Sequence, residues 1–162
     1  AERSVHDALC VVRNVVQEPK VVPGGGAIEV ELALRLREWA RSLVGREQLA
    51  ALKFAEALEV IPSILAENAG LDPIDIMVKL RAEHEKGNVS AGINVKEGTV
   101  SDMYALDVIE PMLVKKQAIK SATEAAIMIL KIDDIIAASA LKKEKEKEKE
   151  REEKPSKFGE EF

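Results

Sequence analysis

Three consecutive glycines, Gly24-Gly25-Gly26, constrain this chain more than any other segment, because they follow a short apolar run and lead directly into a strongly helical stretch. Glycine has no Cβ, so the backbone at a helix entrance can approach another group closely. The first turn of the following helix also offers unpaired N–H groups and the positive end of the helix dipole. Such a run is typical of a loop or hinge, or of a wall that faces a nucleotide. The motif alone leaves both interpretations open.

The composition favours a helical core built from aliphatic side chains. Apolar residues make up 46% of the 162 residues, whereas aromatic residues make up 3% and prolines are few. A chain of this length can bury one hydrophobic core. Because the apolar residues are mostly Ala, Ile, Leu and Val, we expect one principal domain of mainly α class, and an all-β sandwich is disfavoured.

Helical periodicity occurs in several segments that are separated by proline or glycine. Glu18-Pro19 ends the first segment and predicts a boundary or hinge, whereas Asp72-Pro73 supplies an N-cap and a first-turn proline to another. Pro62, inside the longest segment, predicts a kink or the start of a new helix. In the second segment Glu29 falls on the side that faces away from the apolar stripe. The predicted helices cover residues 3–17, 27–44, 47–68, 73–86 and about twenty residues from Glu110-Pro111.

Two other segments of the chain are predicted to contain β-strands, and a third is predicted to be disordered. Residues 91–95 and 99–100 are short β-like pieces around Lys96-Glu97-Gly98, which predicts a small hairpin. The run at residues 132–138 is either a last helical turn or a strand, and its β-branched content favours a short C-terminal strand that needs a partner elsewhere. From residue 142 to 162, Lys and Glu alternate with almost no apolar side chains, so we expect a disordered, solvated tail.

The charge and cysteine content restrict the possible partners. The formal net charge is -5, and the tail holds equal numbers of basic and acidic residues, so the negative excess lies before residue 142. No basic face for nucleic acid is implied. A single cysteine cannot form an internal disulfide, and no leader or membrane-spanning apolar run is visible, so we expect a cytoplasmic protein without a membrane partner. The chain begins at Ala1 inside a helical pattern, which favours a piece of a larger polypeptide.

Three polar residues have both a structural and a chemical interpretation. Asp7 is either a solvated helix acid or a carboxylate that positions a water for attack on a phosphoryl group. Glu110 either caps the helix that follows or accepts hydrogen bonds from two ribose hydroxyls. Asn94 either holds a turn or presents its amide to a purine edge. His6, Cys10 and His84 are too scattered for metal-ligand spacing, so no metal site is predicted.

Five motifs, in this order and spacing, resemble the C-terminal third of a group II chaperonin subunit of the archaeal thermosome type. The resemblance covers roughly residues 2–140, and the charged tail lies outside it. The motifs are Glu2-Arg3-Ser4-Val5-His6-Asp7-Ala8-Leu9, Val22-Pro23-Gly24-Gly25-Gly26-Ala27-Ile28-Glu29, Asn68-Ala69-Gly70-Leu71-Asp72, Gly92-Ile93-Asn94-Val95 and Glu110-Pro111.

The resemblance implies a role for each matching residue. Asp7 matches the catalytic aspartate, which the intermediate domain carries over the γ-phosphate when it closes. Gly24, Gly25 and Gly26 match the glycines against the ribose and base, Asn94 and Val95 match the loop next to adenine, and Glu110 matches the ribose-binding acid. The implied domains are residues 1–18, the last helix of the intermediate domain, and residues 19–141, the C-terminal half of an ATP-binding equatorial domain with a multihelical fold. Residues 142–162 form the tail.

The resemblance also implies ATP-dependent protein folding in a double ring of subunits, with ATP or ADP and Mg²⁺ as ligands and unfolded proteins as clients. However, a Gly-Asp-Gly-Thr-Thr type of phosphate loop, which belongs to the N-terminal half of such subunits, is missing from this sequence, and so is the client-binding apical domain. Most of the electrostatic stabilisation for phosphoryl transfer is then missing, so we expect the chain alone to hydrolyse ATP poorly or not at all. The alternative is a non-enzymatic helical assembly module that keeps ring contacts without useful nucleotide affinity.

Overall fold

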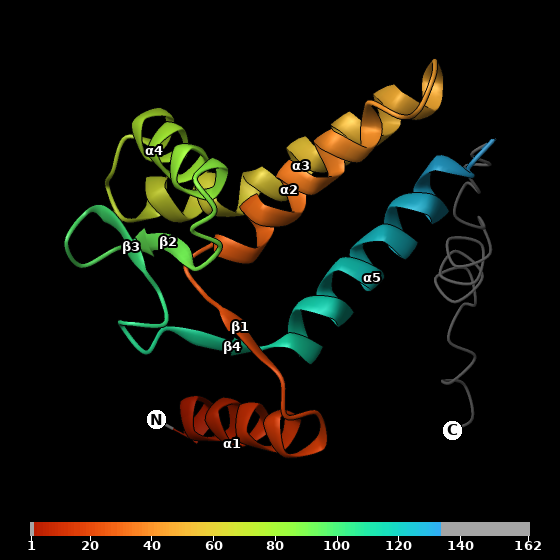
Figure 1. The fold of residues 1–162 in the computed structure, drawn as a ribbon. Coiled ribbons are helices and arrows are strands. Elements are labelled where there is room, and N and C mark those ends of the chain that lie inside the picture. The colour runs from red at the N-terminus through yellow and green to blue at the C-terminus, as the bar shows by residue number, and fades with distance from the viewer. Residues whose placement is uncertain (1, 134–162) are drawn as a thin grey trace, which may run out of the picture. The chain divides into compact units, whose positions relative to one another are not determined.

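A computed structural model describes residues 2–133 of the chain and shows five helices and two pairs of short strands within them (Figure 1). The chain divides into two compact units, Ala1–Ala122 and Thr123–Phe162. The predicted domain boundaries near residues 18 and 142 are not tested by this division. The elements are α1 (Glu2–Gln17), β1 (Val21–Pro23), α2 (Ala27–Ala40), α3 (Arg46–Asn68), α4 (Pro73–Glu85), β2 (Ala91–Asn94), β3 (Thr99–Asp102), β4 (Ile109–Pro111) and α5 (Met112–Leu130).

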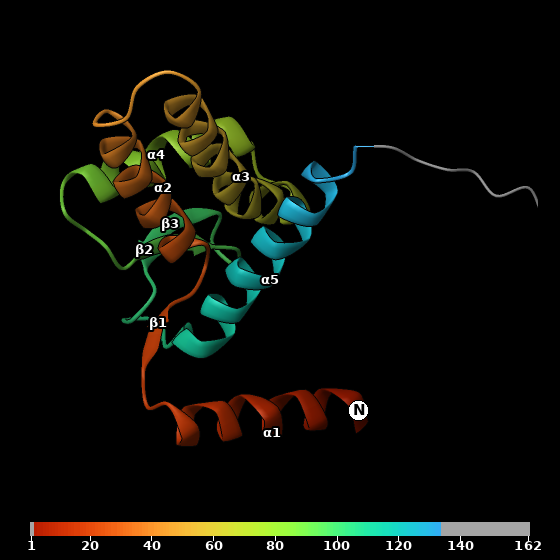
Figure 2. The same ribbon diagram turned by 90° about the vertical axis from the view of Figure 1, so that its right-hand side faces the viewer.

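Helices α2 and α3 lie side by side in both ribbon views and form the largest helix pair (Figures 1 and 2). Small residues let their backbones approach, since Ala33 and Ala55 form one buried cluster with Leu58 between them. A second cluster joins α2, α3, α4 and β2 and contains the fully buried Leu80. The predicted aliphatic, mainly helical core is therefore confirmed.

The strands form two separate antiparallel pairs. β2 pairs with β3, with Ile93 opposite Val100, which confirms the predicted hairpin. β1 pairs with β4, with Val22 opposite Glu110, so the extended piece before the glycines has a partner far along the chain. The sequence gives no local signal for β4, because this pairing joins segments that are distant in sequence.

The start of α4 follows from its sequence as predicted. Asp72 is the N-cap, and its Oδ1 accepts a hydrogen bond from the backbone N–H of Ile74 at 2.8 Å and a longer one from that of Asp75 at 3.4 Å. These bonds satisfy donors that the first helical turn leaves free. Pro73 occupies the first helical position, where its missing N–H costs nothing.

Several predicted boundaries differ from the structure. Helix α2 ends at Ala40 rather than near residue 44, because the chain turns early and Gly45, at φ 70°, becomes the N-cap of α3. Pro62 does not begin a new helix, since α3 runs through it. Helix α5 begins at Met112, one residue after Pro111, because Glu110 and Pro111 belong to β4. The predicted strand at 132–138 lies largely outside the described residues, and Ile132 and Asp133 are not in a strand. The predicted tail lies entirely outside them.

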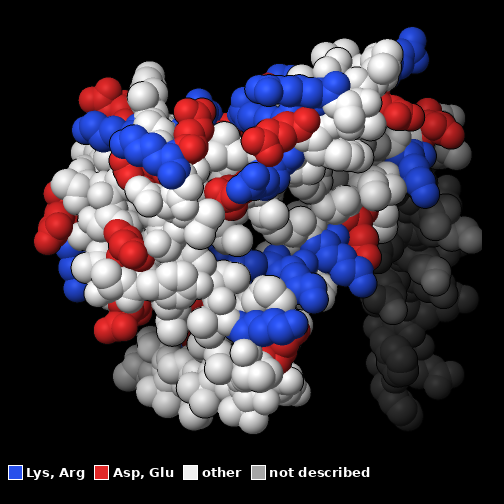
Figure 3. Space-filling view, viewed as in Figure 1, with Lys and Arg blue, Asp and Glu red and all other residues white. Residues whose placement is uncertain are grey.

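Helix α1 is amphipathic as predicted, but none of its residues is buried. Its apolar stripe is open, with Leu9 64% exposed and Val16 78% exposed. In the space-filling view basic and acidic side chains are interspersed over α2, α3 and α4, whereas the face of α1 that this view shows is largely uncharged (Figure 3). Among the described residues, no helix combines the length and the apolar character that a membrane crossing needs.

Candidate functional site

A cavity of about 410 Å³ brings together several of the residues that the sequence singles out. It is lined by Gly25, Asn94, Val95 and Glu110. Gly25 comes from the turn at residues 24–26, called the glycine turn below, Asn94 and Val95 come from the hairpin of β2 and β3, and Glu110 comes from β4. The remaining lining residues are Leu65, Ile93, Lys96, Glu97, Met103, Leu106 and Val108. The cavity thus has a mainly apolar wall, and its polar lining consists of the Asn94 amide, the Glu97 and Glu110 carboxylates and the Lys96 ammonium group.

The glycine turn forms part of this wall and also holds the surrounding segments together. The carbonyl oxygen of Gly25 accepts a hydrogen bond from the backbone N–H of Ile93 at 2.9 Å, and the N–H of Gly24 donates to the carbonyl of Val108 at 2.9 Å. A Cβ on Gly25, at φ 62°, would lie 2.6 Å from the Sδ of Met103 and 2.9 Å from the backbone N of Ile93. The chain itself therefore requires glycine here, whether or not a ligand is present.

The other two glycines lie against protein atoms. A Cβ on Gly24 would lie 2.9 Å from a methyl group of Val108 and 3.3 Å from the Oε1 of Glu110, so Gly24 packs against these two lining residues of the cavity. A Cβ on Gly26 would lie 2.6 Å from the Cβ of Pro62. Gly26 is not among the lining residues, so its close packing against α3 is a structural role.

Asn94 is buried and holds the hairpin turn. Its Oδ1 accepts hydrogen bonds from the backbone N–H of Lys96 at 3.1 Å and of Glu97 at 3.3 Å, and its Nδ2 donates to the Glu97 carboxylate at 3.2 Å. These bonds match the turn interpretation, because asparagine side chains stabilise turns in this way. A contact between Asn94 or its neighbour Val95 and a purine stays a prediction.

Glu110 is half-buried in β4 and shares a cation with a second acid. The Nζ of Lys115 lies 2.9 Å from the Oε2 of Glu110 and 2.7 Å from the Oε1 of Glu29. Burial opposes the positive charge of Lys115, but its hydrogen bonds to Glu29 and Glu110 outweigh burial and raise its pKa above the usual 10.5. The prediction that Glu29 faces away from the core is wrong, because pairing with Lys115 allows this carboxylate to be buried.

Asp7 is exposed on α1 and is not among the residues that line the cavity. The described structure therefore does not bring Asp7 together with Gly25 and Glu110. Its assignment as a catalytic residue stays a prediction.

Sequence reasoning missed the apolar side chains that make the cavity wall: Ile93, Met103, Leu106 and Val108. Nothing in their spacing separates them from ordinary core residues, and Met103 and Ile93 are in fact buried. The pairing of Lys115 with Glu29 was also missed. Helix periodicity shows on which face of its own helix a residue lies, but it does not show which residue of another helix it contacts. The described residues contain no cluster of His, Cys, Asp or Glu that could hold a metal ion.

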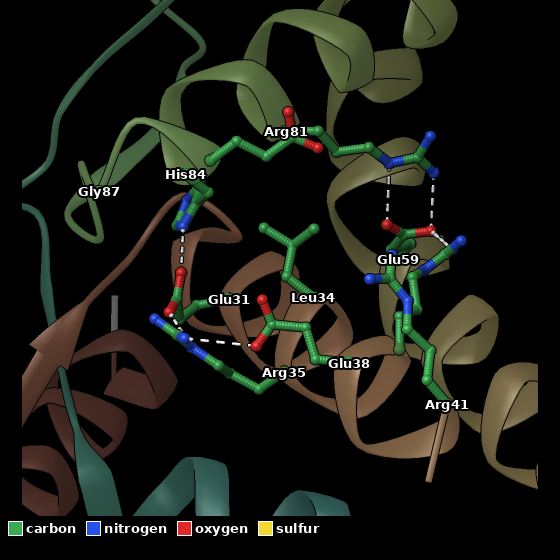
Figure 4. Close-up of a pocket in the computed structure, with 11 residues that line it drawn as sticks. Glu31, Leu34, Arg35, Glu38, Arg41, Glu59, Arg81, His84 and Gly87 are labelled. Carbon is green, nitrogen blue, oxygen red and sulfur yellow. Dashed lines mark hydrogen bonds and ion pairs between the residues drawn. The ribbon is translucent and has the colours of Figure 1, made fainter. Parts of the chain in front are cut away.

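A second cavity, of about 480 Å³, lies between α2, α3 and α4 and is lined mostly by charged side chains (Figure 4). On one side Glu59 is bound by Arg81 and Arg37, and on the other Glu31 is bound by His84 and Arg35. It contains none of the residues predicted for a site, and most of its guanidinium groups already have carboxylate partners. The ion pairs that line this cavity link the three helices.

We expect the interaction of Glu31 with His84 and Arg35 to weaken as the pH falls. The Oε2 of Glu31 lies 2.9 Å from the Nδ1 of the buried His84, whose Nε2 lies 2.9 Å from the Ala91 carbonyl oxygen. Burial would raise the pKa of Glu31, but hydrogen bonds from His84 and Arg35 outweigh burial and lower its pKa below the usual 4.5. A lowered folded-state pKa means that ionised Glu31 stabilises the fold above about pH 4.5 and that this stabilisation is lost as the pH falls through the folded pKa.

Urea denaturation of the wild type and Glu31→Gln from pH 7 to pH 3 measures this effect. The difference in unfolding free energy between the two proteins should be largest near pH 7 and should shrink below about pH 4.5. A difference that stays constant over the whole range would contradict the proposed linkage.

Comparison with known proteins agrees with the resemblance read from the motifs. The profile of the TCP-1/cpn60 chaperonin family matches residues 1–140. The chain is 61% identical to thermosome subunit alpha of Sulfurisphaera tokodaii over 88% of this chain and 26% of that protein. It is 59% identical to thermosome subunit alpha of Archaeoglobus fulgidus, again over 88% of this chain and 26% of that protein.

A solved structure gives the same result for the fold. The open-state monomer of a group II chaperonin from Methanococcoides burtonii superposes with a TM-score of 0.75 and 63% identity, over 81% of this chain and 33% of that chain. The predicted multihelical, chaperonin-like fold is thereby confirmed. The chain spans about a quarter of the length of the curated relatives it matches. By sequence and by fold, it belongs to the TCP-1/cpn60 chaperonin family.

Proposed function

We propose that residues 19–141 form the adenosine-contacting half of an ATP-binding equatorial domain, within a chaperonin that uses ATP hydrolysis to fold proteins. The observation that supports this most is the cavity that Gly25, Asn94, Val95 and Glu110 share. Its volume of about 410 Å³ falls within the range of roughly 300–1,000 Å³ that is usual for small-molecule sites. A mainly apolar wall with a few polar groups at its edge suits a nucleoside.

The proposed binding mode assigns the two chemical parts of adenosine to different residues. The purine ring lies against the apolar wall made by Ile93, Leu106 and Val108, where it loses contact with water. The ribose hydroxyls donate to the carboxylate of Glu110, because an ionised carboxylate offers only acceptors. Gly25 also lines the cavity and contributes no side chain to it.

The triphosphate and magnesium are assigned to the part of a complete subunit that this chain does not include. No described cluster here could hold a metal ion, and the sequence contains no phosphate loop. When bound, Mg²⁺ would neutralise charge on the phosphates during transfer. The residues of this chain therefore bind and orient the nucleoside, and we expect little hydrolysis by the chain alone.

Calorimetric titration of the 162-residue chain with adenosine tests the binding proposal. We expect saturable heat from the wild type and binding about tenfold weaker in Glu110→Gln, since a hydrogen bond to a charged group contributes about 1.5 kcal/mol or more. Glu67→Gln, at an exposed position on α3, is the matched control and should bind like the wild type. The absence of heat from the wild type would favour the alternative of a non-enzymatic assembly module.

We propose that Asp7, on α1, positions the attacking water in a complete subunit. Residues 1–18 are then the last helix of the intermediate domain, and the open apolar stripe of α1 fits a helix that packs against further chain. In a complete subunit, Asp7→Ala should leave ring assembly and ATP binding intact while the hydrolysis rate falls at least about 100-fold. Unchanged turnover in a steady-state phosphate-release assay would rule out this role.

The proposed partners are other chaperonin subunits, joined in a double ring, and unfolded client proteins. The clients would be held by an apical domain that lies outside this sequence. This proposal is supported by the family membership and by the match to a group II chaperonin monomer.

A further inference from the structure

Lys115 lies between the acidic edge of the cavity and a buried acid, and this arrangement suggests a role in selectivity. We propose that Lys115, anchored by Glu29, is a positioning residue that fixes the carboxylate of Glu110 and so makes the site prefer a ribonucleoside to a 2′-deoxyribonucleoside. This inference rests on the proposed binding of adenosine at the cavity.

The three residues come from three different elements. Glu29 lies in the first turn of α2, directly after the glycine turn, Lys115 lies in the first turns of α5, and Glu110 lies in β4. The two nitrogen–oxygen distances at Lys115 are 2.7 Å to Glu29 and 2.9 Å to Glu110. The two carboxylates belong to separate backbone segments, and the helical turn that carries Glu29 directly follows the glycine turn. The ammonium group of Lys115, which binds both carboxylates, therefore fixes the distance between the glycine turn and Glu110.

The two oxygens of Glu110 have different surroundings. Its Oε2 is held by Lys115, whereas its Oε1 faces Gly24, where a Cβ would approach it to 3.3 Å. A carboxylate held by one oxygen keeps a fixed orientation, and its second oxygen stays available as an acceptor. A hydroxyl pair on a ribose needs such a fixed acceptor, because hydrogen bonds weaken steeply when their angle is poor.

The anchor is poorly explained as a device for stability alone. Glu29 is 3% exposed, and its Oε2 has no hydrogen-bond partner among the described residues. Burying a carboxylate with one unsatisfied oxygen has an energetic cost, and a buried ion pair is weak evidence for stabilisation. Lys115 itself is 18% exposed on its side chain and, with its raised pKa, stays charged at neutral pH. The cost is explained if the pair holds Glu110 in place.

Titration of the 162-residue chain with adenosine and with 2′-deoxyadenosine tests this role. We expect the wild type to bind adenosine about tenfold more tightly than 2′-deoxyadenosine, and Lys115→Met to reduce this ratio to about threefold or less. Methionine is unbranched and close to the length of the lysine side chain, but it carries no charge. Lys116→Met is the matched control, because Lys116 is the next residue and its side chain is 65% exposed. It should keep the wild-type ratio.

A second variant covers the possibility that Lys115→Met fails to fold. The double variant Lys115→Met with Glu29→Gln removes the buried acid that would otherwise lose its partner, and circular dichroism checks that the helices are kept. The ratio of the two affinities is the deciding readout, because a merely structural role would weaken both nucleosides equally.

The outcomes separate the two proposals. A ratio near ten in the wild type and in both folded variants would overturn the positioning role while adenosine binding stands. A wild-type chain that binds both nucleosides equally well would also overturn it. A wild-type chain that binds neither nucleoside would overturn the proposed function and, with it, this inference.

Discussion

Gly25→Ala is expected to lower the unfolding free energy of the chain by about 3 kcal/mol, the sum of a backbone and a packing effect. At φ 62° an alanine is in the left-handed region, which costs about 1–2 kcal/mol for a residue with a Cβ. The new Cβ would also lie 2.9 Å from the backbone nitrogen of Ile93. That backbone is held in the β2–β3 hairpin, so relieving the contact requires a backbone shift, which costs about 1–3 kcal/mol.

The matched control for Gly25→Ala is Gly70→Ala. Gly70 has a similar φ of 74°, but a Cβ placed there meets no atom within 4 Å. Gly70→Ala should therefore cost about 1 kcal/mol, the backbone effect alone. Urea denaturation, monitored by circular dichroism, gives the urea concentration at which each variant is half unfolded. These midpoints report the change in stability if m, the slope of the unfolding free energy against urea concentration, is the same in both variants. Equal losses from both variants would show that the glycine turn is not closely packed against β2.

The local parts of the fold could be predicted from the sequence, and the long-range parts could not. Asp72-Pro73 carries the start of α4 in two adjacent residues, and the hairpin around Lys96-Glu97-Gly98 is a contact between near neighbours. In contrast, β1 pairs with β4 across most of the chain, and neither strand is long enough for its pattern to identify a partner. A three-residue strand has too few side chains to show an alternation.

The same difference explains which residues of the cavity could be predicted from the sequence. Gly25, Asn94, Val95 and Glu110 belong to motifs that resemble a known family, and the structure places all four on one cavity. Lys115 belongs to no motif, and its pairing with Glu29 follows from how α5 meets α2. A charge that is paired across a fold looks, in the sequence, like any solvent-exposed charge.

Glu59→Ala is also expected to destabilise the chain by about 3 kcal/mol. The Glu59 carboxylate, on α3, accepts two hydrogen bonds from Arg81 on α4, at 2.9 Å from Nε and 2.7 Å from Nη2, and it also binds the Nη2 of Arg37 on α2. Removing one partner of a buried ion pair typically costs about 3–5 kcal/mol, because it leaves the other charge unpaired. We expect the lower end of that range, since the Arg37 and Arg81 side chains are 35% and 41% exposed and water can reach both guanidinium groups.

Glu56→Ala separates this ionic link from a general effect of removing glutamate from α3. Glu56 lies on the same helix and pairs with Lys53 three residues earlier, but both side chains are more than half exposed. An exposed pair of this kind contributes less than about 1 kcal/mol, and alanine is the better helix former. The unfolding free energy of Glu56→Ala should therefore lie within about 0.5 kcal/mol of the wild-type value. If Glu59→Ala were equally harmless, the three helices would be held by their apolar clusters alone, and the two arginines would be ordinary surface charges.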